Sequence, residues 1–357
     1  MLLPALAAAT GSAARAAGWH ESAQLYTIMA IALHCDESHA PRYLRPGVQG
    51  AELRAQQRKG ECSVSQPKVY QVDLADISLR VTEWPGEGSP VLLLHATGFH
   101  SRCWDEIARR LPGVHMYAVD LRFHGGSERH GEVNWRLMAA DIEQLLDRLD
   151  LRDAVGVGHS IGGYLVAYAG ARQRWRFKRL LLIDPVIFAK QLYEDQFSQA
   201  PQVDPTANPV SRRKNQWQDA EEMYQRFRDR APFAQWEPQI LRDYCEHALR
   251  EVPGESALQL ACDPLHEASI YLSQKGNEAI HDLLPQLTLP VTVLRAPPDP
   301  GNFSNLAASP TWPGLAGALP NATEIYLPDS SHFIPMEDPE LVARLIREAV
   351  AEGGGRP

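Results

Sequence analysis

A serine, a histidine and an aspartate each follow an apolar, strand-like segment of this sequence. Together, these three kinds of side chain can make a hydroxyl group nucleophilic. The first is Ser160, in the G-x-S-x-G pattern of residues 158–162, directly after an apolar run and before a helix-like segment that begins near Gly163. Small residues around the serine allow a tight strand-to-helix turn that exposes the hydroxyl. The pattern alone is common by chance, and its position between a strand and a helix is what indicates a nucleophile.

A serine hydroxyl is a weak nucleophile and needs a base, for which His332 is our first choice. It follows the last expected strand, at an edge of the sheet from which a loop can reach the serine turn. His159 is next to Ser160 but belongs to the turn, so its side chain should point elsewhere. Three other histidines lie in loops and are expected to have structural or pocket-lining roles: His95, His100 and His124.

The third member is a carboxylate that fixes the tautomer of the imidazole and stabilises its cation. Asp299 follows the strand-like run Val291 to Leu294 after a short turn with two prolines, which restrict the backbone that presents it. Asp184 is the alternative, because it also ends a strand-like run, although its carboxylate could instead cap backbone amides. We predict that Asp299, and not Asp184, hydrogen-bonds the ring of His332.

Acyl transfer also needs donors that face the negative charge developing on the substrate oxygen. The backbone N–H of Ile161, the residue after the serine, is one candidate. The second should come from the loop His95 to Phe99, which follows an earlier apolar run, with Thr97 as first choice and Gly98 as the alternative. The sequence therefore predicts an oxyanion hole made of the Thr97 and Ile161 amides.

The elements that position these residues can be read from hydrophobic periodicity. Two short alternating segments, Val69 to Leu74 and Ile77 to Thr82, are expected to pair as antiparallel strands at a sheet edge. Continuous apolar runs then alternate with helical patterns, which indicates a mostly parallel sheet with helices on both faces. The runs are Val91 to His95, Val114 to Val119, Ala154 to Val157, Leu180 to Ile183 and Val291 to Leu294, and a last strand is expected over Thr323 to Leu327. Helices are expected after Asn134 and over Pro339 to Val350.

The strand–helix alternation stops between Pro185 and about Leu284, where Gln, Arg, Trp and Pro are frequent. Because strand character resumes at Val291, we interpret this stretch as a helical cap inserted into one α/β domain. Residues 68–185 and 285–357 are then the core and residues 186–284 the cap. Residues 1–67 form an N-terminal extension that is partly disordered or helical.

Composition narrows the classes of partner. The net charge of −9 argues against nucleic acid, which requires clustered positive charge. The one dense basic run, Arg212 to Lys214, is interpreted as a solvated surface, with contact to an anionic substrate or a membrane as the alternative. No metal site is predicted, since the five cysteines are scattered without a C-x-x-C pair, and we expect no cofactor.

The same cysteine pattern suggests no disulfide framework, so a reducing compartment and a cytoplasmic location are expected. The apolar, alanine-rich start, Leu2 to Ala14, could be a weak targeting peptide, but it has no basic residue before it. The apolar stretch Ala23 to Cys35 is shorter than the roughly 20 residues that span a bilayer. We therefore predict a soluble protein without a membrane span, and leave its oligomeric state open.

Several motifs in the same order resemble the α/β-hydrolase superfamily, from about Val69 to the carboxyl terminus. Besides the serine turn, they are Trp104, the D-L-R-F-H-G-G-S run of residues 120–127, and His332-Phe333. The order serine, aspartate, histidine is the one expected for that fold. Two positions depart from the family pattern: Ala96 replaces the Gly of an H-G pair, which alters the oxyanion loop, and Phe123 replaces a Gly, where we expect an effect on packing only.

The resemblance implies a serine hydrolase that acts through an acyl-enzyme, and a carboxylic ester is our first choice of substrate. Ser160 argues against the aspartate-nucleophile dehalogenases and epoxide hydrolases of the same fold. Carbon–carbon bond hydrolysis, lactone hydrolysis and perhydrolysis use the same three residues and stay open. A non-catalytic binding protein is the remaining alternative. Aromatic residues of the cap favour an apolar pocket and hence a small-molecule, apolar acyl substrate, although most of them could equally form the core of the cap: Trp217, Phe227, Phe233, Trp236 and Tyr271.

Overall fold

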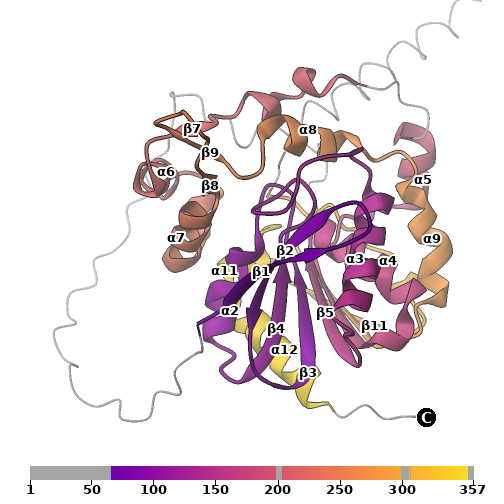
Figure 1. The fold of residues 1–357 in the computed structure, drawn as a ribbon. Helices are drawn as coiled ribbons and strands as arrows, with labels where there is room; N and C mark the ends of the chain where they lie inside the picture. Colours follow the sequence, from indigo (N-terminus) through magenta and orange to yellow (C-terminus); the bar gives the residue numbers. More distant parts are fainter. Residues whose placement is uncertain (1–65, 198–202, 299–304, 306, 353–357) are drawn as a thin grey trace, which may run out of the picture.

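An eight-stranded sheet forms the centre of the computed structural model, which describes residues 66–197, 203–298, 305 and 307–352 (Figure 1). The strands lie in the order β1-β2-β4-β3-β5-β6-β10-β11. Their bounds are β1 Lys68–Asp73, β2 Ser78–Trp84, β3 Glu87–Leu94, β4 Val114–Val119, β5 Ala154–His159, β6 Phe177–Ile183, β10 Val291–Arg295 and β11 Ala322–Tyr326. The fold is the α/β-hydrolase fold that the sequence predicted.

Strand direction follows the predicted division into an edge hairpin and a parallel body. β1 pairs antiparallel with β2, from Lys68 opposite Glu83 to Asp73 opposite Ser78, and β2 pairs antiparallel with β4. The pairs from β4 through β3, β5, β6 and β10 to β11 are all parallel. The carboxyl ends of these parallel strands therefore meet at one edge of the sheet, where loops can bring side chains together.

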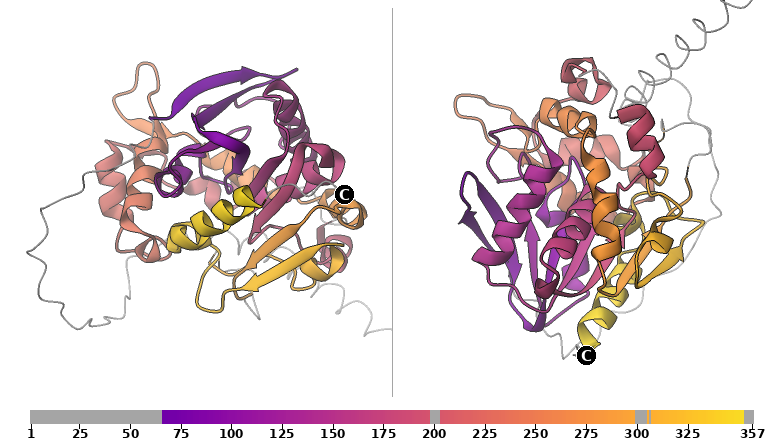
Figure 2. Two further views of the ribbon diagram at one scale, coloured as in Figure 1. Left: turned by 90° about the horizontal axis from the view of Figure 1, so that it is seen from below. Right: turned by 90° about the vertical axis from the view of Figure 1, so that its right-hand side faces the viewer.

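Helices cover both faces of the sheet (Figure 2). Strand β3 shows why, since its alternate residues enter two different cores: Leu92 and Leu94 pack with α3 and α4, and Val91 and Leu93 pack with α2 and α12. The bounds are α2 Asp105–Arg109, α3 Trp135–Arg148, α4 Ile161–Arg172, α9 Ile280–Leu283, α10 Leu315–Ala318, α11 Ile334–Glu337 and α12 Pro339–Ala351.

The segment between β6 and β10 contains short helices and a second, small sheet above the carboxyl edge of the main one (Figure 1). Its helices are α5 Lys190–Leu192, α6 Ala220–Phe227, α7 Pro238–His247 and α8 Pro264–Leu272. The strands β7 Gln216–Trp217, β8 Leu249–Arg250 and β9 Leu258–Leu260 form an antiparallel sheet in the order β7-β9-β8. The sequence predicted helices here and missed this sheet.

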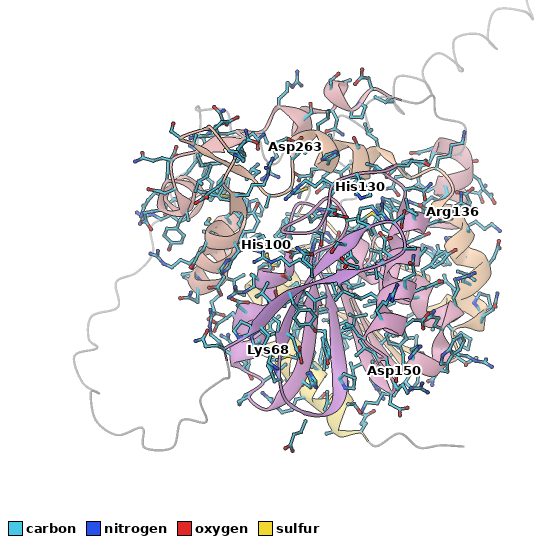
Figure 3. The ribbon with its side chains drawn as sticks, viewed as in Figure 1. Lys68, His100, His130, Arg136, Asp150 and Asp263 are labelled. Carbon is cyan, nitrogen blue, oxygen red and sulfur yellow. The ribbon has the colours of Figure 1, made fainter. Side chains whose placement is uncertain are left out.

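Charged contacts fix this segment to the rest of the molecule. Arg109 of α2 donates to Asp243 of α7 at 2.7 Å, and the neighbouring Arg110 donates to Glu237 at 2.8 Å. Arg129 Nε donates to the carbonyl oxygen of Ala261 at 2.9 Å. Figure 3 shows His100 between the sheet and this segment, with Asp263 above it and Lys68 and Asp150 toward the opposite end of the strands.

Several predictions concern residues outside the described part of the chain. The extension and the weak targeting peptide fall within residues 1–65, so they stay predictions, as does the cytoplasmic location. Three of the five cysteines are described, and Cys103, Cys245 and Cys262 are free and buried. Within the described ranges, no helix combines the length and the apolar character that crossing a membrane requires.

Candidate active site

Ser160 lies on a strained turn between β5 and α4. Its backbone has φ 59° and ψ −120°, in the left-handed region that L residues rarely adopt. A Cβ added at Gly158 would collide with the backbone of Gly162, and one added at Gly162 would collide with the carbonyl of Leu94. The glycines of the pattern are therefore required by close backbone approach, and the turn is the one that the sequence predicted.

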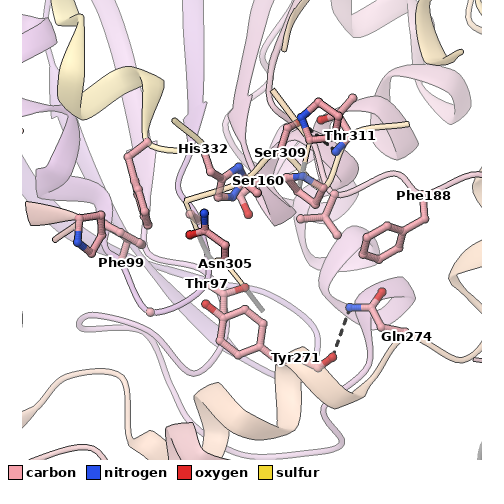
Figure 4. Close-up of a pocket in the computed structure, with 18 of the residues that line it drawn as sticks. Thr97, Phe99, Ser160, Phe188, Tyr271, Gln274, Asn305, Ser309, Thr311 and His332 are labelled. Carbon is pink, nitrogen blue, oxygen red and sulfur yellow. Dashed lines mark hydrogen bonds between the residues drawn. The ribbon is translucent and has the colours of Figure 1, made fainter. Parts of the chain in front are cut away.

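The neighbouring loops are tied to this turn. The Ser160 N–H donates to the carbonyl oxygen of Ile183 at 3.0 Å, and the Val186 N–H donates to the Ser160 carbonyl oxygen at 3.1 Å. His332 lies in the loop after β11, and its backbone N–H donates to the Ala307 carbonyl oxygen at 2.7 Å. Ser160 is 6% exposed, and both side chains line one cavity (Figure 4).

Among the described residues, Asp184 is the carboxylate that the structure pairs with His332. Asp184 Oδ2 lies 2.6 Å from His332 Nδ1, and the aspartate is completely buried. Because a carboxylate only accepts, this bond places the ring proton on Nδ1 and leaves the lone pair of Nε2 free. The prediction that excluded Asp184 from this contact is wrong. Asp299 lies outside the described residues.

The reason is that the other carboxylate oxygen of Asp184 is held by residues that follow β10. Its Oδ1 accepts from the Ala296 N–H at 3.0 Å, from Ser309 Oγ at 2.6 Å and from Thr311 Oγ1 at 3.3 Å. Its backbone has φ 44°, which turns the chain away from β6 at once. Asp184 was the alternative in the sequence analysis, but no local pattern pointed to Ser309 and Thr311 as its partners. These two residues come from a loop 125 and 127 residues away.

His159 has a role that the sequence did not predict. Its Nε2 donates to the backbone carbonyl oxygen of His332 at 2.8 Å, and the two rings lie 5.0 Å apart. Burial lowers the pKa of His159 to about 3, so the ring is neutral at physiological pH. The histidine beside the serine therefore fixes the main chain of the histidine that faces the cavity.

The loop after β3 presents Thr97 and Gly98 in different ways. The Gly98 N–H donates to Nε2 of His124 at 3.0 Å, so this amide is already used. Among the hydrogen bonds of the described residues, none has the Thr97 amide as donor. Ile161 is the first residue of α4, where a backbone N–H has no partner inside the helix. Of the two candidates in the loop, Thr97 is therefore the one whose amide is available.

Buried neutral histidines support this loop. His95 Nδ1 donates to the Ala96 carbonyl oxygen at 2.7 Å, and its Nε2 accepts from the Leu121 N–H at 3.0 Å. His124 Nδ1 donates to the Arg122 carbonyl oxygen at 3.0 Å. Burial lowers the pKa of both rings to about 3, so each stays neutral and can act as donor and acceptor at once.

The cavity that contains Ser160 and His332 has a volume of about 260 Å³. We call its walls from the loops after β3, β5, β10 and β11, together with the buried residues that support these loops, the floor, and its walls from residues 186–284 the roof. In Figure 4, Phe99 and Phe188 lie on opposite sides of the centre, Tyr271 extends from α8, and Gln274 follows the end of that helix. Further aromatic residues of both parts line it: Trp135, Phe233, Tyr244, Trp312 and Phe333. The walls are therefore largely apolar.

One ion pair interrupts these apolar walls. Arg213 Nη1 donates to Glu267 Oε2, and their side chains are 8% and 1% exposed. Burial disfavours the charged form of Arg213, but the attraction of Glu267 outweighs it and raises the pKa of the guanidinium. Burial also raises the pKa of the Glu267 carboxyl, and Arg213 opposes that shift. The interpretation of the basic run as solvated surface is therefore wrong for Arg213.

A family model for the alpha/beta hydrolase family matches residues 91–345, which is most of the chain. The chain belongs to this family. Its residues Ser160, Asp184 and His332 follow β5, β6 and β11, at the carboxyl edge of the parallel strands. Ligand sites of α/β folds usually lie at this edge. Among the described residues, no group of three or more His, Cys, Asp or Glu side chains is arranged to hold a metal ion.

Relatives of the chain include lipases and esterases. It is 23% identical over 277 residues to lipase LipV of Mycobacterium tuberculosis, covering 76% of this chain and 97% of LipV. It is 32% identical over 113 residues to esterase YbfF of Escherichia coli, covering 31% of this chain and 44% of YbfF. The structure of E-2-(acetamidomethylene)succinate hydrolase matches with a TM-score of 0.63 at 20% identity, covering 80% of this chain and 99% of that one.

The departure at Phe123 affects more than packing. Phe123 has φ 73°, a conformation that favours glycine and is strained for a bulky residue. Its ring is buried and lies 4.9 Å from that of His266, which belongs to α8. The strained backbone at Phe123 therefore accompanies a ring contact between the loop after β4 and helix α8. Ala96, the other departure, is buried at the start of the oxyanion loop.

Proposed function

We propose that this alpha/beta hydrolase cleaves small carboxylic esters through an acyl-enzyme, with Ser160 as nucleophile, His332 as base and Asp184 as the acid that orients it. The observation that carries the proposal is the 2.6 Å hydrogen bond between Asp184 Oδ2 and His332 Nδ1. His332 lines the same cavity as Ser160. That bond fixes the tautomer in which Nε2 can accept a proton.

The first half-reaction forms the acyl-enzyme. As the Ser160 hydroxyl attacks the ester carbonyl carbon, His332 Nε2 takes its proton, and the carbonyl electrons move onto the oxygen. The amides of Thr97 and Ile161 donate to this oxyanion. When the tetrahedral intermediate collapses, its bond to the alcohol oxygen breaks, and His332 returns the proton to that oxygen.

The second half-reaction repeats these steps with water. His332 Nε2 takes a proton from water, whose oxygen attacks the acyl carbon. When the second intermediate collapses, the bond between the acyl carbon and Ser160 Oγ breaks, Oγ takes the proton back from His332, and the carboxylic acid leaves. In both halves the ring is transiently cationic, and the buried Asp184 carboxylate stabilises that cation. Ser309, Thr311 and the Ala296 amide hold the carboxylate in place throughout.

The size and walls of the cavity support a small, largely apolar substrate. Its volume of about 260 Å³ is below the ~300–1,000 Å³ that is common for ligand sites. Residues of the segment 186–284 supply much of the wall, so we propose that this segment acts as a cap that limits substrate size. The names of the relatives, a lipase and an esterase, agree with ester hydrolysis.

Covalent labelling and a panel of acyl esters test the proposal. A fluorophosphonate should modify Ser160, identified by peptide mass mapping, and p-nitrophenyl esters of two to five carbons should be turned over faster than those of ten or more. Ser160→Ala should abolish labelling and reduce kcat by at least about 10⁴-fold, with an unchanged unfolding temperature. Near-normal turnover by Ser160→Ala would refute the nucleophile, and labelling without turnover of any ester would refute the reaction.

A further inference from the structure

The buried ion pair of Arg213 and Glu267 is a part of the cavity that the proposed triad does not use. Arg213 directly follows the short 3-10 helix Pro209–Arg212, and Glu267 lies on α8. Both side chains line the same cavity as Ser160 and His332. The pair is therefore placed where a bound substrate would meet it.

The pair balances its own charge. Of the described residues that line the cavity, Arg213 and Glu267 are the only Arg, Lys, Asp or Glu. Besides Glu267, Arg213 contacts the hydroxyl of Tyr244 at 3.5 Å, and the strongest charged neighbour of Glu267 is Arg213. The guanidinium does not lose its proton, so an ionised Glu267 brings the charge of the pair to zero. The wall that faces a substrate therefore carries no net charge.

The carboxylate also lies close to the oxyanion loop. A Cβ added at Gly98 would come within 2.6 Å of Glu267 Oε1. Gly98 follows Thr97, the proposed oxyanion donor, so the pair lies near the carbonyl that reacts. Groups attached to that carbonyl on this side would approach the pair within the apolar cavity.

A charged substrate would be penalised in such a place. A carboxylate would lose its hydration shell on entry, would be repelled by Glu267, and would have to compete with it for Arg213. An ammonium group would meet the opposite repulsion from Arg213. An uncharged group disturbs neither partner. Selectivity of this kind comes from rejecting the wrong ligand rather than from attracting the right one.

We propose that Glu267 neutralises Arg213 and so lets the largely apolar cavity select uncharged esters, which makes Glu267 the specificity-determining residue that excludes carboxylate-bearing ones. This inference rests on the proposed ester hydrolysis. Removing the negative partner alone leaves Arg213 unbalanced beside the substrate, so Glu267→Gln should convert the cavity into one that accepts anions. Removing both charges should keep the original preference, because the apolar cavity then holds no cation that attracts a carboxylate. Apolar replacement of a buried ion pair is often tolerated by the fold.

The experiment measures kcat/KM at pH 8 for two esters of similar length: p-nitrophenyl pentanoate and the mono-p-nitrophenyl ester of adipic acid. Wild type should prefer pentanoate. Glu267→Gln should raise the adipate-to-pentanoate ratio by at least about tenfold, as expected when one partner of a buried charge pair is removed. The double variant Arg213→Met with Glu267→Leu should return the ratio to that of wild type.

Glu221→Gln is the matched control, because Glu221 pairs with Arg242 at 3.4 Å, is 58% exposed and does not line the cavity. Its ratio should equal that of wild type. A Glu267→Gln variant that stays folded and keeps the wild-type ratio within about twofold would overturn the inference. So would a wild type that prefers adipate.

A second measurement separates this inference from the proposed reaction. The rates at which a neutral alkyl fluorophosphonate and its carboxylate-bearing counterpart label Ser160 give the same selectivity without any turnover. If labelling follows the predicted ratios in wild type, Glu267→Gln and the double variant but no ester is hydrolysed, only the proposed reaction fails. If both probes label all variants at equal rates, the selectivity fails whatever the ester assay gives.

Discussion

The floor and the roof of the cavity hold their charged groups in different ways. Behind the wall of the floor, the buried carboxylate Asp184 is surrounded by donors: the Ala296 amide, two hydroxyls and His332. In the roof, Glu267 and Arg213 satisfy one another. A carboxylate held by hydrogen bonds keeps its charge available to a neighbouring ring, whereas a carboxylate held by a guanidinium has its charge cancelled. The floor is thus suited to stabilising a transient cation and the roof to presenting a neutral wall.

The two parts also differ in how their elements form. Floor residues follow long parallel strands, so each is placed by a strand end and a short loop. Roof residues lie on helices of ten residues or fewer and on strands of two or three. Elements this short have little stability of their own and depend on packing against their surroundings. Changes in the floor should therefore affect turnover, and changes in the roof should affect the choice of substrate.

The largest effect should come from the floor carboxylate. Asp184→Asn should lower kcat by about 10⁴-fold with little change in KM, because an amide that donates to Nδ1 favours the wrong imidazole tautomer, as in serine proteases. Steady-state kinetics on p-nitrophenyl butyrate would measure it. Asp299→Asn is the matched control and should stay close to wild type. The reverse ranking of the two variants would return the role to Asp299.

The next effect concerns the buried neutral histidines that support the floor. His95, His124 and His159 have pKa values of about 3 when folded and an ordinary value near 6.5 when unfolded. Their contribution to stability is complete above about pH 6.5 and is lost as the pH falls toward 3, because protons then bind preferentially to the unfolded chain. As the pH falls below about 6.5, each of the three histidines should lower the free energy of unfolding by up to about 1.4 kcal/mol per pH unit.

Urea unfolding at pH 7.5 and pH 5.5 would measure this loss. His124→Gln should be less stable than wild type at pH 7.5, since it disturbs the bond to the Gly98 amide. It should lose less stability on acidification, because one titrating group is gone. Equal losses in the two proteins would contradict the assignment of His124 as a neutral support.

The smallest effect should come from the contact where floor and roof meet. Gly98 has φ +81°, and an added methyl group would lie 2.6 Å from Glu267 Oε1. Gly98→Ala should destabilise the protein by about 1–3 kcal/mol, through backbone strain and the collision together. Gly254→Ala isolates the strain, because Gly254 has φ +85° and no atom within 4 Å of the added carbon.

Thermal unfolding of both glycine variants would separate the two terms. Gly98→Ala should lower the unfolding temperature more than Gly254→Ala, and it should also lower kcat because Thr97 precedes it. An equal loss of stability with unchanged turnover would show that the floor and roof are not in effective contact at this position.

The sequence by itself determined the features that depend on neighbouring residues. The turn at Ser160 needs small residues within four positions of one another, and the G-x-S-x-G pattern displays them directly. The strand β4, Val114–Val119, was predicted with its observed bounds because a continuous apolar run of six residues is a strong local signal. The three-stranded sheet of the roof was missed because strands of two or three residues have no measurable periodicity.

Only the tertiary structure decided which carboxylate meets His332 and where Arg213 lies. Asp184 and His332 are 148 residues apart, and both candidate aspartates follow parallel strands, so sequence position could not rank them. The buried position of Asp184 depends on a third segment, in which Ser309 and Thr311 donate hydrogen bonds to its carboxylate. In the same way, Arg213 in a basic run appears solvated until α8 brings Glu267, 54 residues later, to its side. Burial of a charge depends on its partner, and the partner is fixed by the fold.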